Sequence, residues 1–214
     1  MPYELNATVR VRAGVHDEDY PDLKLAGWQG RIIEIDAEEA LYLVAWDSRS
    51  LWEVAPDYIA QCEAEEVEWW SFYLSADEIA PAPPRDTAAA AEATVAHIER
   101  LRKASFEDYE QELVAVLRRC KSGEEWEVVR SWWKRLRDHL ALPLEAVSGA
   151  GGPLQPGEPL RLVALLEPKG AEPLRGEVLH RSERRPYPLQ ALIPLEEDET
   201  THWLYAYQLW AASR

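Results

Sequence analysis

The 214-residue sequence contains two cysteines and has no apolar run long enough to cross a membrane. Cys62 and Cys120 lie far apart in sequence, which favours reduced, structural thiols over a disulfide framework. A membrane helix needs about 20 consecutive apolar residues, and no stretch approaches that length. No early apolar stretch is typical of a signal peptide. We therefore expect a cytoplasmic protein that makes no contact with membranes.

Basic residues are scarce, since 23 Lys and Arg stand against 39 Asp and Glu, giving a formal net charge of -16. Nucleic-acid phosphates would be repelled by such a chain, so a nucleic-acid partner is not expected. Residues 1–86 carry 19 acidic and 6 basic side chains, residues 87–142 carry 10 of each, and residues 143–214 carry 10 and 7. The acidity therefore belongs mainly to the first third of the chain.

The sequence also lacks the motifs of several enzyme classes. Its five histidines, at positions 16, 97, 139, 180 and 202, are scattered and form no His-Glu-x-x-His. Gly27-Trp-Gln-Gly30 lacks the Gly-Lys-Ser/Thr ending of a phosphate-binding loop, and no Gly-x-Ser-x-Gly elbow is present. A Ser-His-Asp triad stays open, because its members need not be close in the chain. We expect a protein without enzymatic activity.

The acidic first third contains short β-rich runs. Val9 and Val11 alternate with arginines, which is typical of a half-buried strand. Residues 30–35 and 40–46 flank an acidic turn and predict a hairpin, Pro56 opens a short helix, and residues 72–74 resume an extended path. This pattern around residues 27–31 resembles an SH3-like small barrel, a similarity that indicates no activity.

The middle of the chain is helical. The proline-rich residues 81–85 predict a linker, after which Thr87 caps an alanine-rich helix. Capping-box patterns at Ser105 and Ser122 predict two more helices. Apolar residues at steps of three and four on both predict an antiparallel helical hairpin that turns at residues 121–123. The predicted seam residues are Phe106, Tyr109, Leu113, Val116 and Cys120 on one helix, and Trp126, Val129, Trp133, Leu136 and Leu140 on the other.

Two adjacent tryptophan pairs, Trp69-Trp70 and Trp132-Trp133, need an explanation. Neighbouring side chains point to opposite faces of a strand, or about 100° apart on a helix, so one small core does not bury both. We expect one member of each pair to pack between a barrel and the helical hairpin. A groove for a binding partner is the alternative, because tryptophan is enriched at binding hot spots.

The last third contains three β-rich runs within residues 159–195, followed by an acidic segment and a closing helix with Trp203, Tyr207 and Trp210 at helical spacing. We find no repeat of fixed period. Both ends of the chain do show a strand, a Gly-Arg or Arg-Gly turn and a second strand. The sequence thus predicts an α+β protein in which two small SH3-like β-barrel units flank a helical hairpin. The predicted domains are residues 1–82 and 87–214.

Three segments carry a resemblance to a known family: the tryptophan-rich residues 131–146, the strand entry at 153–162, and Tyr187-Pro-Leu-Gln-Ala-Leu192 with the acidic segment and Tyr207-Gln-Leu-Trp210 that follow it. Together, residues 105–214 resemble the bacterial calcium-binding protein family typified by that of heterocyst-forming cyanobacteria (CcbP-like). The resemblance implies a small, acidic, non-enzymatic protein that binds Ca²⁺ at carboxylate-rich surfaces.

Calcium requires about six to eight oxygen ligands, several of them carboxylates. One candidate cluster is Asp17-Glu-Asp-Tyr-Pro-Asp22, which lacks the glycine and the later glutamate of an EF-hand loop. A second is residues 196–199, whose acids would also complement the dipole of the helix that follows. A third acidic run, at residues 63–68, is interpreted as a solvated helix face. The predicted metal ligands are Asp17, Asp19, Asp22, Glu196, Asp198 and Glu199.

These observations leave two hypotheses. The first is a calcium buffer or sensor that uses acidic surface loops, with weak affinity of about 10⁻⁴ to 10⁻³ M. The second is a metal-independent adaptor that binds a protein partner with a basic surface. The acids concentrate outside the family-like half of the chain, so ligand density does not decide between them.

Overall fold

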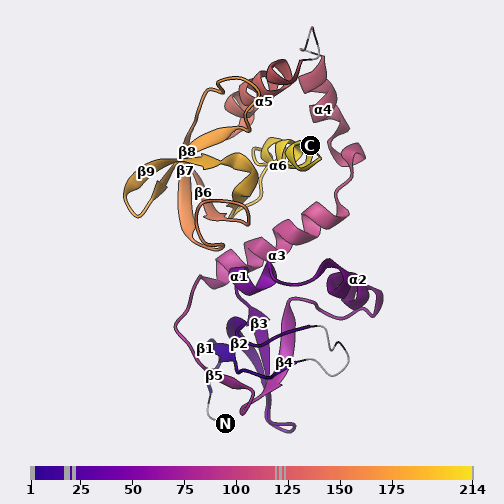
Figure 1. The fold of residues 1–214 in the computed structure, drawn as a ribbon, viewed down its shortest axis with the longest axis vertical. Helices are drawn as coiled ribbons and strands as arrows, with labels where there is room; N and C mark the ends of the chain where they lie inside the picture. The colour runs from indigo at the N-terminus through magenta and orange to yellow at the C-terminus, as the bar shows by residue number, and fades with distance from the viewer. Residues whose placement is uncertain are drawn as a thin grey trace. The chain divides into compact units, whose positions relative to one another are not determined.

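The computed structural model describes residues 3–16, 20, 23–118, 120, 122 and 124–213. The chain divides into two compact units, Met1–Val95 and Ala96–Arg214, and each is considered by itself (Figure 1). Within the described ranges, no helix has the length and apolar character that crossing a membrane requires.

The first unit is built on an antiparallel sheet with the strand order β4-β3-β2-β1-β5. Its strands are β1 (Thr8–Val11), β2 (Gln29–Asp36), β3 (Leu41–Trp46), β4 (Ser71–Ser75) and β5 (Ile79–Pro81). Val9 and Val11 are buried and Arg10 is exposed, which confirms the predicted alternation. The predicted hairpin is confirmed by the antiparallel pairing of β2 with β3.

Three helices belong wholly or partly to this unit: α1 (Ser48–Leu51), α2 (Pro56–Ala64) and the first part of α3 (Ala88–Lys103). Pro56 occupies the first turn of α2, as predicted. Thr87 Oγ1 accepts a hydrogen bond from Ala90 N at 3.2 Å, which confirms the predicted cap of α3.

The second unit contains another antiparallel sheet, in the order β10-β6-β7-β8-β9. Its strands are β6 (Leu144–Ser148), β7 (Pro159–Leu165), β8 (Arg175–His180), β9 (Glu183–Pro188) and β10 (Leu192–Pro194). A short 3₁₀ turn, η2 (Leu189–Ala191), connects the last two strands.

The two sheets have the same topology. In each, four consecutive strands form a meander and the fifth strand returns to pair with the first. Each also has a register shift between its second and third strands, at Ile32/Glu34 in one and Leu162/Ala164 in the other. The α+β class is therefore confirmed, with two open five-stranded sheets whose closure into SH3-like barrels is not shown. The Gly-Arg and Arg-Gly pairs were predicted to be turns. This prediction is wrong, because the pairs lie inside β2 and at the start of β8.

The helices of the second unit begin with the rest of α3 and continue through η1 (Phe106–Tyr109), α4 (Glu110–Leu117), α5 (Glu125–His139) and α6 (His202–Ala212). The predicted capping box at Ser105 is present, with Asp108 Oδ2 accepting from Ser105 N at 2.7 Å. The box predicted at Ser122 is wrong, because α5 begins two residues later behind Glu124. Helices α4 and α5 pack together, with Ser131 Oγ donating to Val116 O at 3.0 Å.

The buried face of α5 differs in part from the predicted seam. Val129, Leu136 and Leu140 are buried as predicted, but Trp126 is 42% exposed and Trp132 is buried in place of Trp133. Trp132 is buried because α5 packs against α6 as well as α4. Its ring lies 6.4 Å from Trp203 and 5.9 Å from both Tyr207 and Trp210, measured between centroids.

Helix α6 is fastened to the sheet of the second unit by buried hydrogen bonds. Tyr207 Oη accepts from Leu174 N at 2.8 Å, and Gln208 Nε2 donates to the carbonyls of Leu189 and Leu192 at 2.9 and 2.7 Å. Buried polar groups paired in this way fix the position of a helix more tightly than apolar contact alone.

Candidate functional site

The predicted ligands Glu196, Asp198 and Glu199 are all exposed, and they do not form one group. Asp198 Oδ1 accepts hydrogen bonds from Thr200 Oγ1, Thr200 N and Thr201 N at 2.7, 2.8 and 2.9 Å. The Thr200 hydroxyl, followed by the backbone N–H groups, lowers the pKa of Asp198. Glu197 pairs with Arg100. Asp198 therefore shapes the turn that leads into α6.

The other predicted ligands, Asp17, Asp19 and Asp22, lie outside the described residues. Within the part of the chain that the structure describes, no three His, Cys, Asp or Glu side chains gather closely enough to hold a metal ion. A calcium site would need carboxylates from residues 17–22 in addition to those described.

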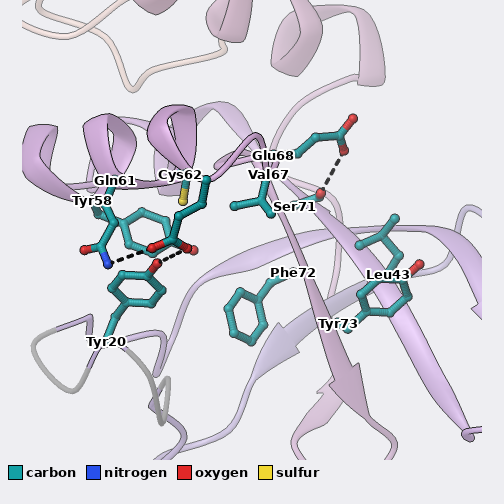
Figure 2. A pocket seen from close by; sticks show the side chains of 11 residues that line it. Tyr20, Leu43, Tyr58, Gln61, Cys62, Val67, Glu68, Ser71, Phe72 and Tyr73 are labelled. Atoms are coloured by element: carbon teal, nitrogen blue, oxygen red, sulfur yellow. Dashed lines mark hydrogen bonds between the residues drawn. The ribbon is translucent and has the colours of Figure 1, made fainter.

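One residue of the acidic segment 17–22 is described, and it contacts a second acidic segment. Tyr20 Oη donates to Glu65 Oε2 at 2.8 Å, just beyond the end of α2. Gln61 Nε2 donates to the other oxygen, Glu65 Oε1, at 3.1 Å. The rings of Tyr20 and Tyr58 meet edge to face with centroids 4.9 Å apart (Figure 2). Tyr20 and Glu65, which are 45 residues apart in sequence, are therefore in direct contact.

These residues line a cavity of about 790 Å³ between α2, the segment after it, and strands β3 and β4 (Figure 2). Its lining includes four aromatic rings, from Tyr20, Tyr58, Phe72 and Tyr73, and two carboxylates, from Glu65 and Glu68. The remaining lining residues are Leu43, Gln61, Cys62, Val67 and Ser71. No basic side chain is among them. The cavity therefore combines apolar faces with uncompensated negative charge.

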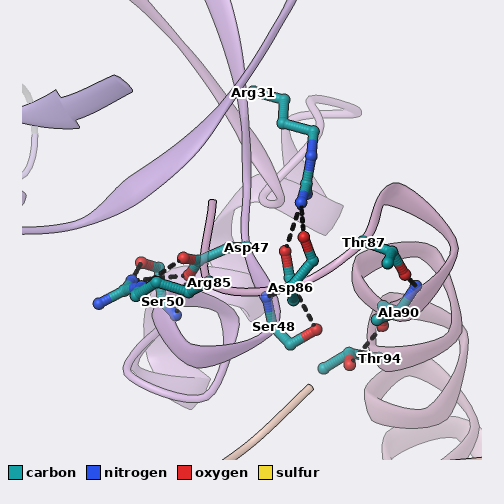
Figure 3. A network of polar contacts seen from close by, with 9 residues as sticks. All are labelled: Arg31, Asp47, Ser48, Ser50, Arg85, Asp86, Thr87, Ala90 and Thr94. Carbon is teal, nitrogen blue, oxygen red and sulfur yellow. Dashed lines mark hydrogen bonds and ion pairs between the residues drawn. The ribbon is translucent and has the colours of Figure 1, made fainter. Parts of the chain in front are cut away.

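Two ion pairs with almost fully buried carboxylates stabilise the same unit (Figure 3). Asp47, 2% exposed, receives Arg85 through both oxygens at 2.6 and 2.8 Å. Asp86, 1% exposed, pairs with Arg31 at 2.7 Å and accepts from the backbone N and the hydroxyl of Ser48, both at 2.7 Å. Paired and hydrogen-bonded in this way, these charges are structural. They also fix residues 85 and 86 to the sheet and to α1.

Two histidines of the second unit lie in partly buried pairs with glutamate. His180 Nε2 is 2.7 Å from Glu158 Oε2, and His202 Nε2 is 3.1 Å from Glu112 Oε1. Ser148, which is close to Glu158, directs its hydroxyl to the carbonyl of Gln155 and not to His180. The Ser148 hydroxyl is therefore not positioned for proton transfer to that histidine.

Sequence reasoning missed the aromatic part of the cavity and interpreted Glu65 and Glu68 as a solvated helix face. Both glutamates are exposed, but they follow the end of α2 at Ala64, so they are not on a helix face, and they line the cavity. The available signal was the tyrosine inside Asp17-Glu-Asp-Tyr-Pro-Asp22, since an aromatic ring within an acidic segment needs a surface to pack against.

No protein-family model matches the chain, and no curated protein matches it. Two solved structures are similar, described as the crystal structure of Anabaena CcbP and as a calcium binding protein in the calcium-binding form. Each has a TM-score of 0.43 and 11% sequence identity. The matches cover 51% and 53% of this chain and 94% of each of the other chains. They amount to a distant structural resemblance over about half of the chain.

Proposed function

We propose that the protein is a non-enzymatic calcium-binding protein whose site is formed by the acidic segment 17–22 together with Glu65. The observation that carries the proposal is the hydrogen bond from Tyr20, the described residue of the acidic segment 17–22, to Glu65 beyond the end of α2.

The chemistry of Glu65 suits a hard cation. Both of its hydrogen-bond donors, the Tyr20 hydroxyl and the Gln61 amide, are neutral, so they do not cancel the carboxylate charge. A carboxylate oxygen has more than one acceptor position, so each oxygen of Glu65 can ligate a cation while keeping its hydrogen bond. Oxygen ligands from two segments and from water fit the flexible coordination of calcium, at an affinity of about 10⁻⁴ to 10⁻³ M.

A calorimetric titration with calcium, at physiological salt and with excess magnesium, tests this proposal. We expect saturable heat from the wild-type protein and none from a triple variant with Asp17, Asp19 and Asp22 changed to Asn. Glu65→Gln should weaken binding, because it removes one charged ligand. A double variant, Glu196→Gln with Glu199→Gln, makes a similar change in charge at the second predicted cluster and should bind as the wild type does.

Three results would contradict the proposal. Absence of saturable heat in the wild type would remove calcium binding altogether. Unchanged binding by the triple variant would remove the segment 17–22 from the site. Loss of binding in the double variant alone would move the site to the second unit.

A further inference from the structure

The cavity of the first unit has a property that calcium binding does not use: four aromatic rings line it together with the two glutamates. Calcium requires oxygen ligands and gains little from an aromatic face. An organic cation is attracted both by carboxylates and by the negative faces of aromatic rings. The lining therefore fits a positively charged organic group better than a bare metal ion.

The charge of the cavity is not compensated by a basic side chain among the described residues. Among the described residues, neither Glu65 nor Glu68 forms an ion pair with a lysine, arginine or histidine. Glu68 instead accepts a hydrogen bond from the Ser71 hydroxyl at 3.2 Å, another neutral donor. An entering cation would supply the missing opposite charge without first displacing a basic side chain that is already present.

The position of the cavity favours a peptide as the carrier of that cation. Phe72 and Tyr73 belong to β4, which is the last strand in the order of its sheet and pairs with β3 on one side. An extended peptide can pair with the free side of an edge strand while its side chains enter neighbouring pockets. A volume of about 790 Å³ exceeds what one side chain fills and leaves room for the flanking backbone.

We propose that this cavity binds a lysine or arginine side chain of a basic peptide segment in a partner protein. Glu65 and Glu68 supply the charge, and the rings of Tyr58 and Phe72 supply the apolar and cation–π contacts (Figure 2). The Tyr73 ring lies on the opposite face of β4, where its hydroxyl donates to Glu34 Oε1 at 3.2 Å. The proposal does not depend on calcium. It goes beyond the proposed function by adding a second kind of cation with different requirements.

A nuclear magnetic resonance titration of the ¹⁵N-labelled full chain tests the proposal, with EDTA present to remove divalent ions. The probe is tetralysine, acetylated and amidated at its ends, and tetraserine is the neutral control. We expect saturable shifts in the amide signals of Tyr58, Gln61, Phe72 and Tyr73 with tetralysine. Tetraserine should cause none.

Variants separate specific binding from general attraction to an acidic protein. Glu65→Gln combined with Glu68→Gln should weaken tetralysine binding by about tenfold or more, since two charged contacts are lost. Glu92→Gln alters an exposed acid of α3 outside the cavity, so it should change the affinity for tetralysine less than about twofold. Phe72→Leu keeps the net charge and should weaken binding by several fold, about three- to tenfold. Tyr73→Leu removes a ring from the opposite face of β4, at a position 45% exposed, and should change the affinity less than about twofold.

The proposal is overturned if Phe72→Leu binds tetralysine as the wild type does, since attraction would then be purely electrostatic. It is equally overturned if the shifts never saturate or are spread over acids throughout the chain. The calcium proposal is judged separately, because changing Asp17, Asp19 and Asp22 to Asn should abolish calcium binding and leave the saturable tetralysine shifts in place.

Discussion

In the first unit the most deeply buried charges are two carboxylates paired with arginines, whereas in the second unit the space beside α5 is filled by aromatic rings. The two sheets below these features have the same strand order and the same position of the register shift. A common topology is therefore stabilised by ionic hydrogen bonds in one unit and by aromatic packing in the other. The comparison teaches that strand order does not dictate the chemistry that covers a sheet.

The two units also differ in how the helices beside each sheet are packed. In the second unit Tyr207 of α6 accepts a buried hydrogen bond from Leu174 N, Gln208 donates one to Leu189 O, and the apolar side chains of α6 are packed. In the first unit α2 and the segment after it leave a cavity that carries negative charge. The cavity of the first unit thus brings charged and aromatic groups within reach of a ligand.

The aromatic side of the comparison is tested most strongly by Trp132→Ala. Trp132 is fully buried against three rings of α6, so its removal should cost about 3–5 kcal/mol in the free energy of unfolding. Trp126→Ala, at a position 42% exposed on the same helix, should cost far less. Urea denaturation gives both values, and hydrogen exchange identifies the unit that opens. Equal losses for the two variants would show that the ring cluster contributes no special stability.

The ionic side is tested by Asp86→Ala. This change leaves Arg31 without its buried carboxylate and Ser48 without an acceptor, so we expect a loss of about 3 kcal/mol, at the lower end for a broken buried pair. Glu53→Ala breaks an exposed pair with Arg49 and should cost about 0–1 kcal/mol. Urea denaturation again measures both. If Asp86→Ala were as mild as Glu53→Ala, the buried pairs would not distinguish the first unit from the second.

The dependence of folding stability on pH tests the second unit further, with a smaller expected effect. Burial lowers the pKa of His97 from 6.5 to about 4, because the charged form is poorly solvated inside. Below pH 6.5 His97 binds a proton in the unfolded chain but not in the folded unit. The free energy of unfolding therefore falls progressively between pH 6.5 and 4.

At high pH the dependence has the opposite sign, because stability falls as the pH rises. Burial raises the pKa of Tyr207 and of Tyr187 from 10.0 to about 12, so the unfolded chain loses these protons first and stability falls between pH 10 and 12. Tyr207→Phe should flatten that upper slope and cost about 1 kcal/mol at neutral pH through the lost acceptor for Leu174 N. Denaturation midpoints across pH measure both effects. An upper slope that is unchanged in the variant would contradict this assignment.

Much of the fold could be predicted from the sequence where the signal is local. The alternation at Val9 and Val11, the β2–β3 hairpin, the Thr87 cap and the Ser105 capping box all depend on residues close in the chain. The strands that were missed include β5 and β9, which lie at sheet edges. Edge strands tolerate Pro81 and the charged residues 183–185, and these residues hide the pattern of a strand.

The candidate site could be predicted only in part, because its parts come from distant segments. The acids of residues 17–22 and 63–68 are evident in the sequence, but the contact between Tyr20 and Glu65 spans 45 residues and has no local signal. Similarly, a single helical seam could not place Trp132, since α5 is packed by α4 and α6 on different faces. Local periodicity describes one partner of a helix and does not reveal a second.

The attachment of residues 85 and 86 has a practical consequence for dissecting the chain. A fragment that stops at residue 82 would lose both Arg85 and Asp86, which leaves Asp47 and Arg31 with no counter-ion in the interior. The shortest N-terminal piece that keeps its internal charges balanced must therefore extend past the proline-rich stretch and include Asp86.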